Sequence, residues 1–430
     1  MNKFQIIILA IFVVAIIGGA IAFATYKGGQ STTLPPVTIW GTLPTDTIQK
    51  YIQEINSARS QQLQISYVHV DPTNFNTTLI NALASGTGPD VVLLPQDLLS
   101  NYTNKIVPIP YNVLTQRDFM NTYVGGTQLY LGAQGVLAIP VLIDPLVMYW
   151  NRDLFTNAGL ANYPAYWDEF PGLVQKLTQI DSNSNILKSI VSLGEFSNVP
   201  HAREIFGSLL LQLGNPVSVQ TSSGLVSALG NSSAYQGEDS TTQVLNFFDE
   251  FADPTSPDYS WNRGLPSADA DFLSGNLAVY FGFASEINSL RNKNPNINFD
   301  AAPLPQVRNS STKAVYGTIY GLSIVRSSTN PTNAYNIIQI LTDPSNLSTL
   351  VGLTYLPPAR RDMIAAGTTD PYLSIFYNAA LLTKSWGDMD PTQSYSILQA
   401  MVESVTSGSK SVHQAIQDAN NQYNLSLQNK

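Results

Sequence analysis

The chain has 430 residues, of which 44% are hydrophobic and only 12% are charged, and its formal net charge is −9 at pH 7. This length exceeds what one hydrophobic core normally covers, so we expect two domains or one domain with two lobes. The acidic balance argues against a nucleic-acid partner, which requires a basic face, and an uncharged ligand fits it better.

The first 26 residues determine the predicted compartment. Residues 4–23 form an uncharged apolar run of about the length that a bilayer-spanning helix requires. We predict a retained transmembrane anchor over residues 1–26 and a Gly/Ser/Thr/Pro linker over residues 27–36. The alternative is a signal peptide that is cleaved after the small-x-small triplet 22–24. In both cases the body of the protein lies on the extracytoplasmic side of the cell membrane.

The folded body begins at Val37 with alternating strand and helix signals. Residues 48, 51, 52 and 55 are apolar and define one face of an amphipathic helix. The order strand, helix, strand, helix, strand is typical of a parallel α/β sheet. The predicted segments are strands at 37–40, 63–70 and 89–94, a helix at 46–59, and a second helix through Leu79 and Leu83 that ends at Gly86.

The same patterns recur later in the chain, with no short-period repeat that would indicate a solenoid or a propeller. Apolar residues at helical spacing predict helices around 170–177, 244–251, 334–341 and 412–419. Strands are predicted at 277–283, 298–304 and 321–325. Between these elements, the segment 137–155 combines two prolines, the lone acid Asp144 and two aromatic residues.

Catalytic and metal-binding motifs are missing from the sequence. The absence of cysteine excludes disulfides, thiolate nucleophiles and thiolate zinc sites, and the three histidines are scattered. The G-x-S-x-G, H-E-x-x-H and G-x-x-x-x-G-K-[ST] motifs are absent, and the S-x-x-K match at 407–410 has no partner motif. We therefore predict no enzyme, no metal and no cofactor.

Aromatic residues gather near the predicted loops and strand ends. Aromatic rings stack on the apolar faces of sugars, and carboxylates and amides accept hydrogen bonds from hydroxyls. An acidic cleft rich in aromatic and amide side chains would suit a neutral polyol. The aromatic residues are Trp40, Tyr149, Trp150, Trp167, Trp261, Phe283, Tyr320, Tyr355, Trp386 and Tyr395.

Six segments, taken in chain order, resemble the extracellular solute-binding proteins of ABC importers, in particular the maltose- and oligosaccharide-binding group. A seventh segment, 407–423, is similar to the last helix of that family. The six are LINALASGTGPDVVLL (79–94), LAIPVLIDPLVMYWNRDLFTNAGL followed by YPAYWDEF (137–170), DFLSGNLAVYFGF (271–283), FDAAPLP (299–305), YGTIYGLSIVRSSTNPTNAYNIIQILT (316–342) and YLPPARRDM (355–363).

The resemblance implies an α/β fold with two lobes of the periplasmic-binding-protein type II, each lobe a mostly parallel sheet flanked by helices. Lobe 1 would comprise 37–142 and 301–352, and lobe 2 would comprise 143–300 and 353–430. Residues 137–141 would form a strand that leaves lobe 1, 142–146 the hinge crossing, and 147–155 the start of lobe 2.

The implied function is that of an extracytoplasmic substrate-binding protein. It would be a monomer that captures a mono- or oligosaccharide by closing its lobes and delivers the sugar to an ABC transporter permease. The alternatives are an exported carbohydrate-active hydrolase and a sensory binding protein that is not coupled to import.

The resemblance also carries nine ligand-binding positions to this chain. Three of them have alternative structural roles, namely Asp97 as a helix N-cap, Asp144 as a turn residue before Pro145 and Phe283 as a core residue. Leu94 and Leu98 depart from the residues that oligosaccharide binders often carry, which puts an extended sugar chain in doubt. The nine residues are Trp40, Gly41, Thr42, Asp97, Asp144, Phe283, Thr318, Tyr320 and Tyr395.

Overall fold

The computed structural model describes residues 35–59, 62–222, 224–230, 234–235, 238–388 and 390–428. The predicted anchor at 1–26 and the linker up to residue 34 lie outside these described residues. Within the described ranges, no helix has both the length and the apolar character that crossing a membrane requires.

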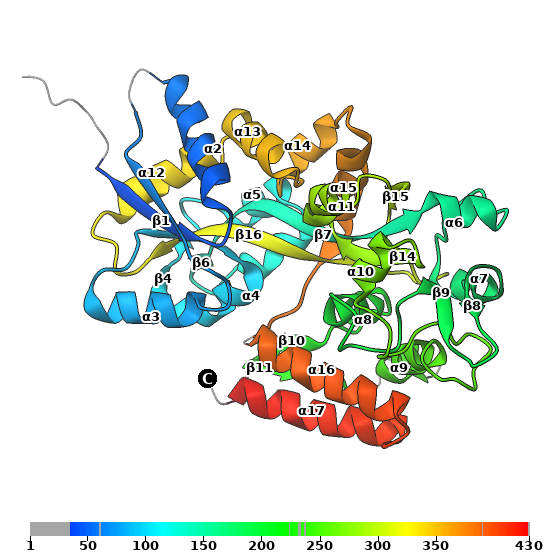
Figure 1. Cartoon of the computed structure of the whole chain (residues 1–430). Coiled ribbons are helices and arrows are strands. Elements are labelled where there is room, and N and C mark those ends of the chain that lie inside the picture. The colour runs from blue at the N-terminus through cyan, green and yellow to red at the C-terminus, as the bar shows by residue number, and fades with distance from the viewer. Residues whose placement is uncertain are drawn as a thin grey trace, which may run out of the picture.

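A single hydrogen-bonded path of strands runs through both lobes (Figure 1). Its order is β2-β1-β3-β16-β7-β14-β9-β8, and β4, β15 and β17 pair with it at the side. The strands are β1 (Val37–Gly41), β2 (Ile65–His69), β3 (Val91–Pro95), β4 (Ile106–Val107), β7 (Ile139–Asn151), β8 (Gln179–Ile180), β9 (Ile186–Val191), β14 (Leu277–Phe283), β15 (Phe299–Ala302), β16 (Val315–Val325) and β17 (Thr383–Lys384).

The pairing is less parallel than predicted. The pairs β1–β2, β1–β3 and β14–β9 are parallel, whereas β3–β16, β16–β7 and β7–β14 are antiparallel. These three antiparallel pairs involve the two long strands β7 and β16, and the pair β8–β9 at the end of the path is antiparallel as well. Three separate antiparallel pairs of short strands complete the described strands, namely β5 (Ile109–Pro110) with β6 (Gly135–Val136), β10 (Ser218–Thr221) with β11 (Gly224–Ser227), and β12 (Ala234–Tyr235) with β13 (Glu238–Asp239).

The segment that contains Pro140 and Pro145 forms one continuous strand, β7. The sequence predicts three parts here, namely a strand that leaves lobe 1, a hinge crossing and the first residues of lobe 2. Pro140 pairs with Gly321 and Pro145 pairs with Gly317 on β16. The pairing shifts by one residue between Tyr320 and Gly321, which is a β-bulge, so residues 139–145 of β7 face residues 317–322 of β16 and Val141 is the extra residue. A proline donates no hydrogen bond to a neighbouring strand. Because of the bulge, both prolines of β7 lie opposite glycines of β16.

Helices cover the sheet of lobe 1, and the predicted helix at 46–59 is confirmed as α2. It buries Ile48, Tyr51, Ile52 and Ile55 and packs against α13, while α12 packs on β16 and β1. The helices are α2 (Thr45–Ser57), α3 (Phe75–Ser85), α4 (Gln96–Leu99), α5 (Gln116–Thr122), α12 (Pro331–Leu341) and α13 (Pro344–Thr354), with 3-10 turns η1 (Ser100–Lys105) and η2 (Gly125–Tyr130). The next helix, α14 (Arg361–Ala366), falls in the range expected for lobe 2 but contacts α5.

The helices of lobe 2 surround β14 and β9. In Figure 1, α16 and α17 lie below α8 and α9, and both also contact α9. The helices are α6 (Arg152–Asn157), α7 (Phe170–Leu177), α8 (Ala202–Gln212), α9 (Ser240–Glu250), α10 (Ala268–Leu273), α11 (Ile287–Lys293), α15 (Pro371–Leu382), α16 (Pro391–Thr406) and α17 (Val412–Gln428), with 3-10 turns η3 (Trp167–Glu169) and η4 (Ala284–Glu286). Of these, α15 packs on β7 close to the crossing.

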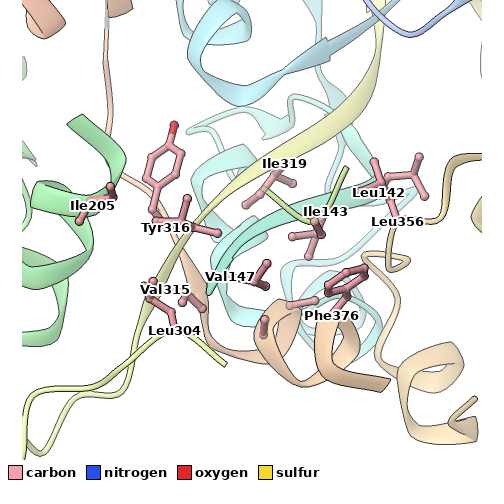
Figure 2. Packing of buried hydrophobic residues seen from close by; sticks show 14 of the residues in the cluster. Leu142, Ile143, Val147, Ile205, Leu304, Val315, Tyr316, Ile319, Leu356 and Phe376 are labelled. Atoms are coloured by element: carbon pink, nitrogen blue, oxygen red, sulfur yellow. The ribbon is translucent and has the colours of Figure 1, made fainter. Parts of the chain in front are cut away.

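The hydrophobic core is continuous along the two crossing strands. Figure 2 shows Ile143 and Val147 of β7 beside Ile319 of β16, with Phe376 of α15 on one side and Ile205 of α8 on the other. All five side chains are at most 1% exposed. The junction of the lobes is therefore packed like an interior and holds the surrounding polar side chains in place.

Candidate ligand-binding site between the lobes

Two predicted site residues face each other on the crossing strands. Asp144 of β7 pairs with Thr318 of β16. Asp144 is only 6% exposed, and its Oδ1 accepts a hydrogen bond of 3.0 Å from the backbone N–H of Ser285, which belongs to η4 of lobe 2. Burial raises the pKa of Asp144 to about 7, although the hydrogen bond from Ser285 opposes this shift.

Asp97 sits at the start of α4 and reaches across to lobe 2. Its Oδ2 accepts a hydrogen bond of 3.0 Å from the Tyr316 hydroxyl and lies 3.6 Å from Nη2 of Arg203, at the start of α8. Burial raises the pKa of Asp97 to about 6, and the charge of Arg203 limits that rise. This carboxyl group therefore connects the two lobes next to the crossing strands.

Phe283 ends β14 and is half-buried, so it is not simply a core residue. Its ring centroid lies 4.8 Å from the ring of His201 and 6.2 Å from the ring of Tyr316. The hydroxyl of the fully buried Tyr149 donates a hydrogen bond of 2.8 Å to the carbonyl of Phe283 and fixes its backbone. The predicted aromatic thus lies beside polar groups from three elements.

Sequence reasoning missed the residues that begin α8. His201 precedes the helix and its Nε2 lies 2.7 Å from Oε1 of Glu286. Arg203 is buried, donates to Ser394 at 3.0 Å, and forms ion pairs of 2.5 Å with both Glu204 and Asp388. A signal was present, because three ionisable residues within 201–204 are unusual in a chain with only 12% charged residues.

Arg203 is one cation with three acidic neighbours. One guanidinium group is surrounded by the carboxyl groups of Asp97, Glu204 and Asp388, and its centre lies 4.9 Å from the centroid of the Trp386 ring. A buried cation with several acidic partners is held firmly, because removing one partner leaves another buried charge uncompensated. Arg203 therefore fixes the start of α8 against α16 and the segment that precedes it.

These residues form one connected group, which we call the interlobe cluster. The group combines two aromatic rings, a histidine, an arginine and three carboxyl groups, and it draws on both lobes. It consists of Asp97, Asp144, His201, Arg203, Phe283, Glu286 and Tyr316.

Other predicted residues lie beside the cluster or apart from it. Tyr320 is half-buried on β16, and burial together with the charges of Asp144 and Asp97 raises its pKa. Trp40 and Gly41 lie within β1, not in the turn after it. A Cβ at Gly41 would come within 2.8 Å of the Tyr67 hydroxyl, so this glycine serves packing.

Thr42 and Tyr395 are the remaining predicted residues. Oγ1 of Thr42 is buried and has no hydrogen-bond partner among the residues that the structure describes. Tyr395, on α16, donates a hydrogen bond of 2.9 Å to the carbonyl of Phe196 and packs on the ring of that residue. The predicted set is therefore brought together only in part.

Three surface cavities lie away from these residues. They have volumes of about 270, 390 and 330 Å³ and are centred near Phe247, Thr383 and Tyr377, respectively. No predicted site residue lines any of these three. Cavity volume alone would place the site at one of these three cavities. We identify the candidate site instead by the chemistry of its side chains and by its position between the lobes.

Comparisons with known proteins agree with this architecture. A family model described as bacterial extracellular solute-binding protein matches residues 41–346. A search of curated proteins returned no match.

Solved structures are similar over nearly the whole chain. A cyclo/maltodextrin-binding protein in complex with maltotetraose is 17% identical, with a TM-score of 0.72 over 91% of this chain and 97% of that chain. The cyclic alpha-maltosyl-1,6-maltose binding protein from Arthrobacter globiformis is 18% identical, with a TM-score of 0.74 over 92% and 99%. The GacH receptor of Streptomyces glaucescens, also solved with acarbose, is 16% identical, with a TM-score of 0.69 over 91% and 98%.

At these identities the structural likeness establishes the two-lobed fold, and the match to the family model covers more than half of the chain. The protein therefore belongs to the bacterial extracellular solute-binding proteins.

Proposed function

We propose that this protein is the carbohydrate-binding subunit of an ABC importer and that its ligand binds at the interlobe cluster. The observation that carries the proposal is the chemistry of the cluster. The half-buried ring of Phe283 contacts the rings of His201 and Tyr316, and these two side chains in turn contact the carboxyl groups of Glu286 and Asp97. Rings of this kind stack on sugars, and carboxylates accept hydrogen bonds from hydroxyls. The sugars named for the similar structures support the same ligand class.

We propose capture by lobe closure, without chemistry on the ligand. Such closure requires a ligand that binds the closed arrangement more tightly than the open one. A ligand that touches Asp97 and Phe283 together would contact both lobes and would favour the closed arrangement. The lobe bounds 37–142 with 301–352 and 143–300 with 353–430, and a monomeric state, are parts of this proposal.

A thermal-shift assay with a sugar panel tests the proposal. We expect at least one of maltotetraose, mannotriose and acarbose to raise the melting temperature in a concentration-dependent manner, since a ligand of the folded state stabilises it. Phe283→Ala should reduce the shift, whereas Tyr166→Ala, at a half-buried ring in contact with Arg308 and outside the interlobe cluster, should not. A response to a peptide, a polyamine or a metal ion, with none to any sugar, would overturn the assignment.

Two further experiments address the alternatives. Incubation of the protein with labelled maltotetraose should return the sugar intact, and formation of shorter sugars would favour a hydrolase. Attachment through residues 1–26 predicts that the full chain stays with membranes after a carbonate wash. Release of a shortened chain into the medium would instead favour a cleaved signal peptide.

A further inference from the structure

His201 holds a backbone conformation that favours glycine. Its φ is 61° and its ψ is 19°, immediately before α8. A side chain in the left-handed region is strained, and such strain persists only where surrounding contacts enforce it. This backbone conformation accompanies a position of the imidazole within the interlobe cluster. The contacts of the ring therefore indicate what holds His201 in this conformation.

Glu286 fixes the imidazole ring from one side. Its Oε1 lies 2.7 Å from Nε2 of His201 and accepts a hydrogen bond of 2.8 Å from the N–H of Phe283. Its Oε2 accepts a hydrogen bond of 2.7 Å from the Tyr280 hydroxyl. Both carboxylate oxygens are thus engaged, and an acceptor at Nε2 places a proton on that nitrogen.

The other ring nitrogen of His201 is available to a ligand. Within the described part of the chain, Nδ1 has no hydrogen-bond partner and is not among the buried unpaired atoms, and 26% of the His201 side chain is exposed. The ring stands nearly perpendicular to the ring of Phe283, at an interplanar angle of 77° and a centroid distance of 4.8 Å. A sugar stacked on Phe283 would therefore lie beside this nitrogen.

Charges from three elements act on the ring. Glu286 of η4, Asp144 of β7 and Glu204 of α8 are the carboxyl groups that affect it, and Arg203 follows it on α8. Burial lowers the pKa of His201, but the hydrogen bond that the ring donates to Glu286 and these negative charges outweigh burial and raise the pKa. The ring therefore keeps its second proton to a higher pH than a free histidine does, and Nδ1 is then a donor.

We propose that His201 is a specificity-determining ligand contact, which donates a hydrogen bond from Nδ1 to an oxygen of a sugar stacked on Phe283, with Glu286 as the residue that positions the ring. This inference rests on the proposed sugar-binding function. It adds a pH dependence, because loss of the Nδ1 proton removes the donor while the contact between Nε2 and Glu286 remains.

The first experiment measures the ring in the ligand-free protein. The chain has three histidines, so a long-range proton–nitrogen NMR spectrum across pH 5 to 9 resolves each ring, and substitution assigns them. We expect His201 to titrate at higher pH in the folded protein than in the urea-unfolded chain, and Glu286→Gln to lower its midpoint in the folded protein. Equal midpoints for His201 in the folded and the unfolded chain would contradict the electrostatic part of the inference.

The second experiment measures binding of the panel sugar with the largest thermal shift, by calorimetry over the same pH range. A glutamine at 201 can replace the Nε2 contact with Glu286 but offers no group at the Nδ1 position. His201→Gln should therefore weaken binding about tenfold or more below the His201 midpoint, as loss of a charged donor does, and should flatten the pH profile. His413→Gln, on the exposed face of α17, is the matched control and should behave like the wild type.

His201→Asn covers the case in which the glutamine variant folds poorly, because asparagine tolerates the left-handed region and carries an amide near the Nδ1 position. It should keep more affinity than the glutamine variant and lose the pH dependence. If the wild type binds a sugar and both variants match its affinity and pH profile, the role of His201 is wrong while the proposed function stands. If no panel sugar binds the wild type, both fail together.

Discussion

At the scale of single residues, Asp144 shows how position determines chemistry. The sequence predicts Asp144 in a hinge crossing, but it lies in the middle of a continuous strand, where it is 6% exposed and accepts a hydrogen bond from the N–H of Ser285. A carboxyl group so placed is costly in its charged form, which is why burial raises its pKa to about 7. The same group would gain from a ligand hydroxyl that donates a hydrogen bond to it.

We predict that Asp144→Asn stabilises the protein at alkaline pH while it weakens sugar binding. The folded-state pKa of Asp144 lies above the ordinary value of 3.8, so its ionisation costs stability as the pH rises from about 4 to 7, and the cost is complete above pH 7. Asparagine does not ionise, and its side-chain oxygen can still accept the hydrogen bond from the N–H of Ser285. We expect a gain on the order of 2–4 kcal/mol in urea unfolding at pH 8, which vanishes near pH 4.

Asp144→Ala is the contrasting variant, because it leaves the N–H of Ser285 without its acceptor and should lose about 1–3 kcal/mol of stability. A calorimetric titration with the panel sugar then separates the two roles. If Asp144→Asn binds the sugar as tightly as the wild type, or loses affinity only as far as its lower melting temperature explains, Asp144 serves the fold and not the ligand.

At the scale of elements, sequence patterns predicted the amphipathic helix α2 and the buried strands β3 and β14, but missed the buried helix α8. The helix α2 was found because its apolar residues repeat on one face. In α8, ten of eleven residues are buried, so no polar face breaks its apolar run and the helical pattern is lost. His201 precedes this helix and Arg203 lies in its first turn, so sequence reasoning missed both site residues along with the helix.

Pairing between distant strands was equally inaccessible to local reasoning. The positions of Pro140 and Pro145 make sense only opposite Gly321 and Gly317, which lie more than 170 residues away along the chain. The resemblance to a known family nevertheless assigned Asp97, Asp144 and Phe283 to one ligand-binding cleft. Members of a family share a fold, so matching motifs in the same order imply the same long-range contacts. Thr318 lies beside them by strand pairing, whereas Tyr395 is tied to Phe196.

The packing of α8 gives a prediction for the element. A Cβ at Gly207 would lie 2.3 Å from the Trp386 ring, and this ring stacks on Arg203. Gly207→Ala should therefore cost about 1–3 kcal/mol in urea unfolding, despite the better helix propensity of alanine, and should weaken sugar binding by moving the start of α8.

The matched control is Gly172→Ala in α7, where a Cβ would meet nothing within 4 Å. It should leave binding unchanged and add up to about 1 kcal/mol of stability from helix propensity alone. Equal behaviour of the two alanine variants would mean that Trp386 moves aside without cost.

At the scale of the whole molecule, the two lobes share their central strands. β7 and β16 pair with each other and carry the core of the junction, so neither lobe has a complete sheet without them. The contacts of Asp97 with Tyr316 and Arg203 add polar links at the same place. Lobe motion must therefore bend these strands and leave their pairing intact, which is the behaviour of a hinge.

This sharing predicts that the protein unfolds in one cooperative transition, although chains of this size often unfold domain by domain. Trp40 lies on β1 of lobe 1, and the other four tryptophans are at positions 150, 167, 261 and 386. In urea, the fluorescence of Trp40→Phe reports those four positions, and its difference from the wild type reports Trp40. Both signals should share one midpoint with the circular dichroism at 222 nm, because breaking the β7–β16 ladder exposes the core of both lobes at once. Two separated midpoints would show instead that each lobe keeps a core stable enough to survive without the shared strands.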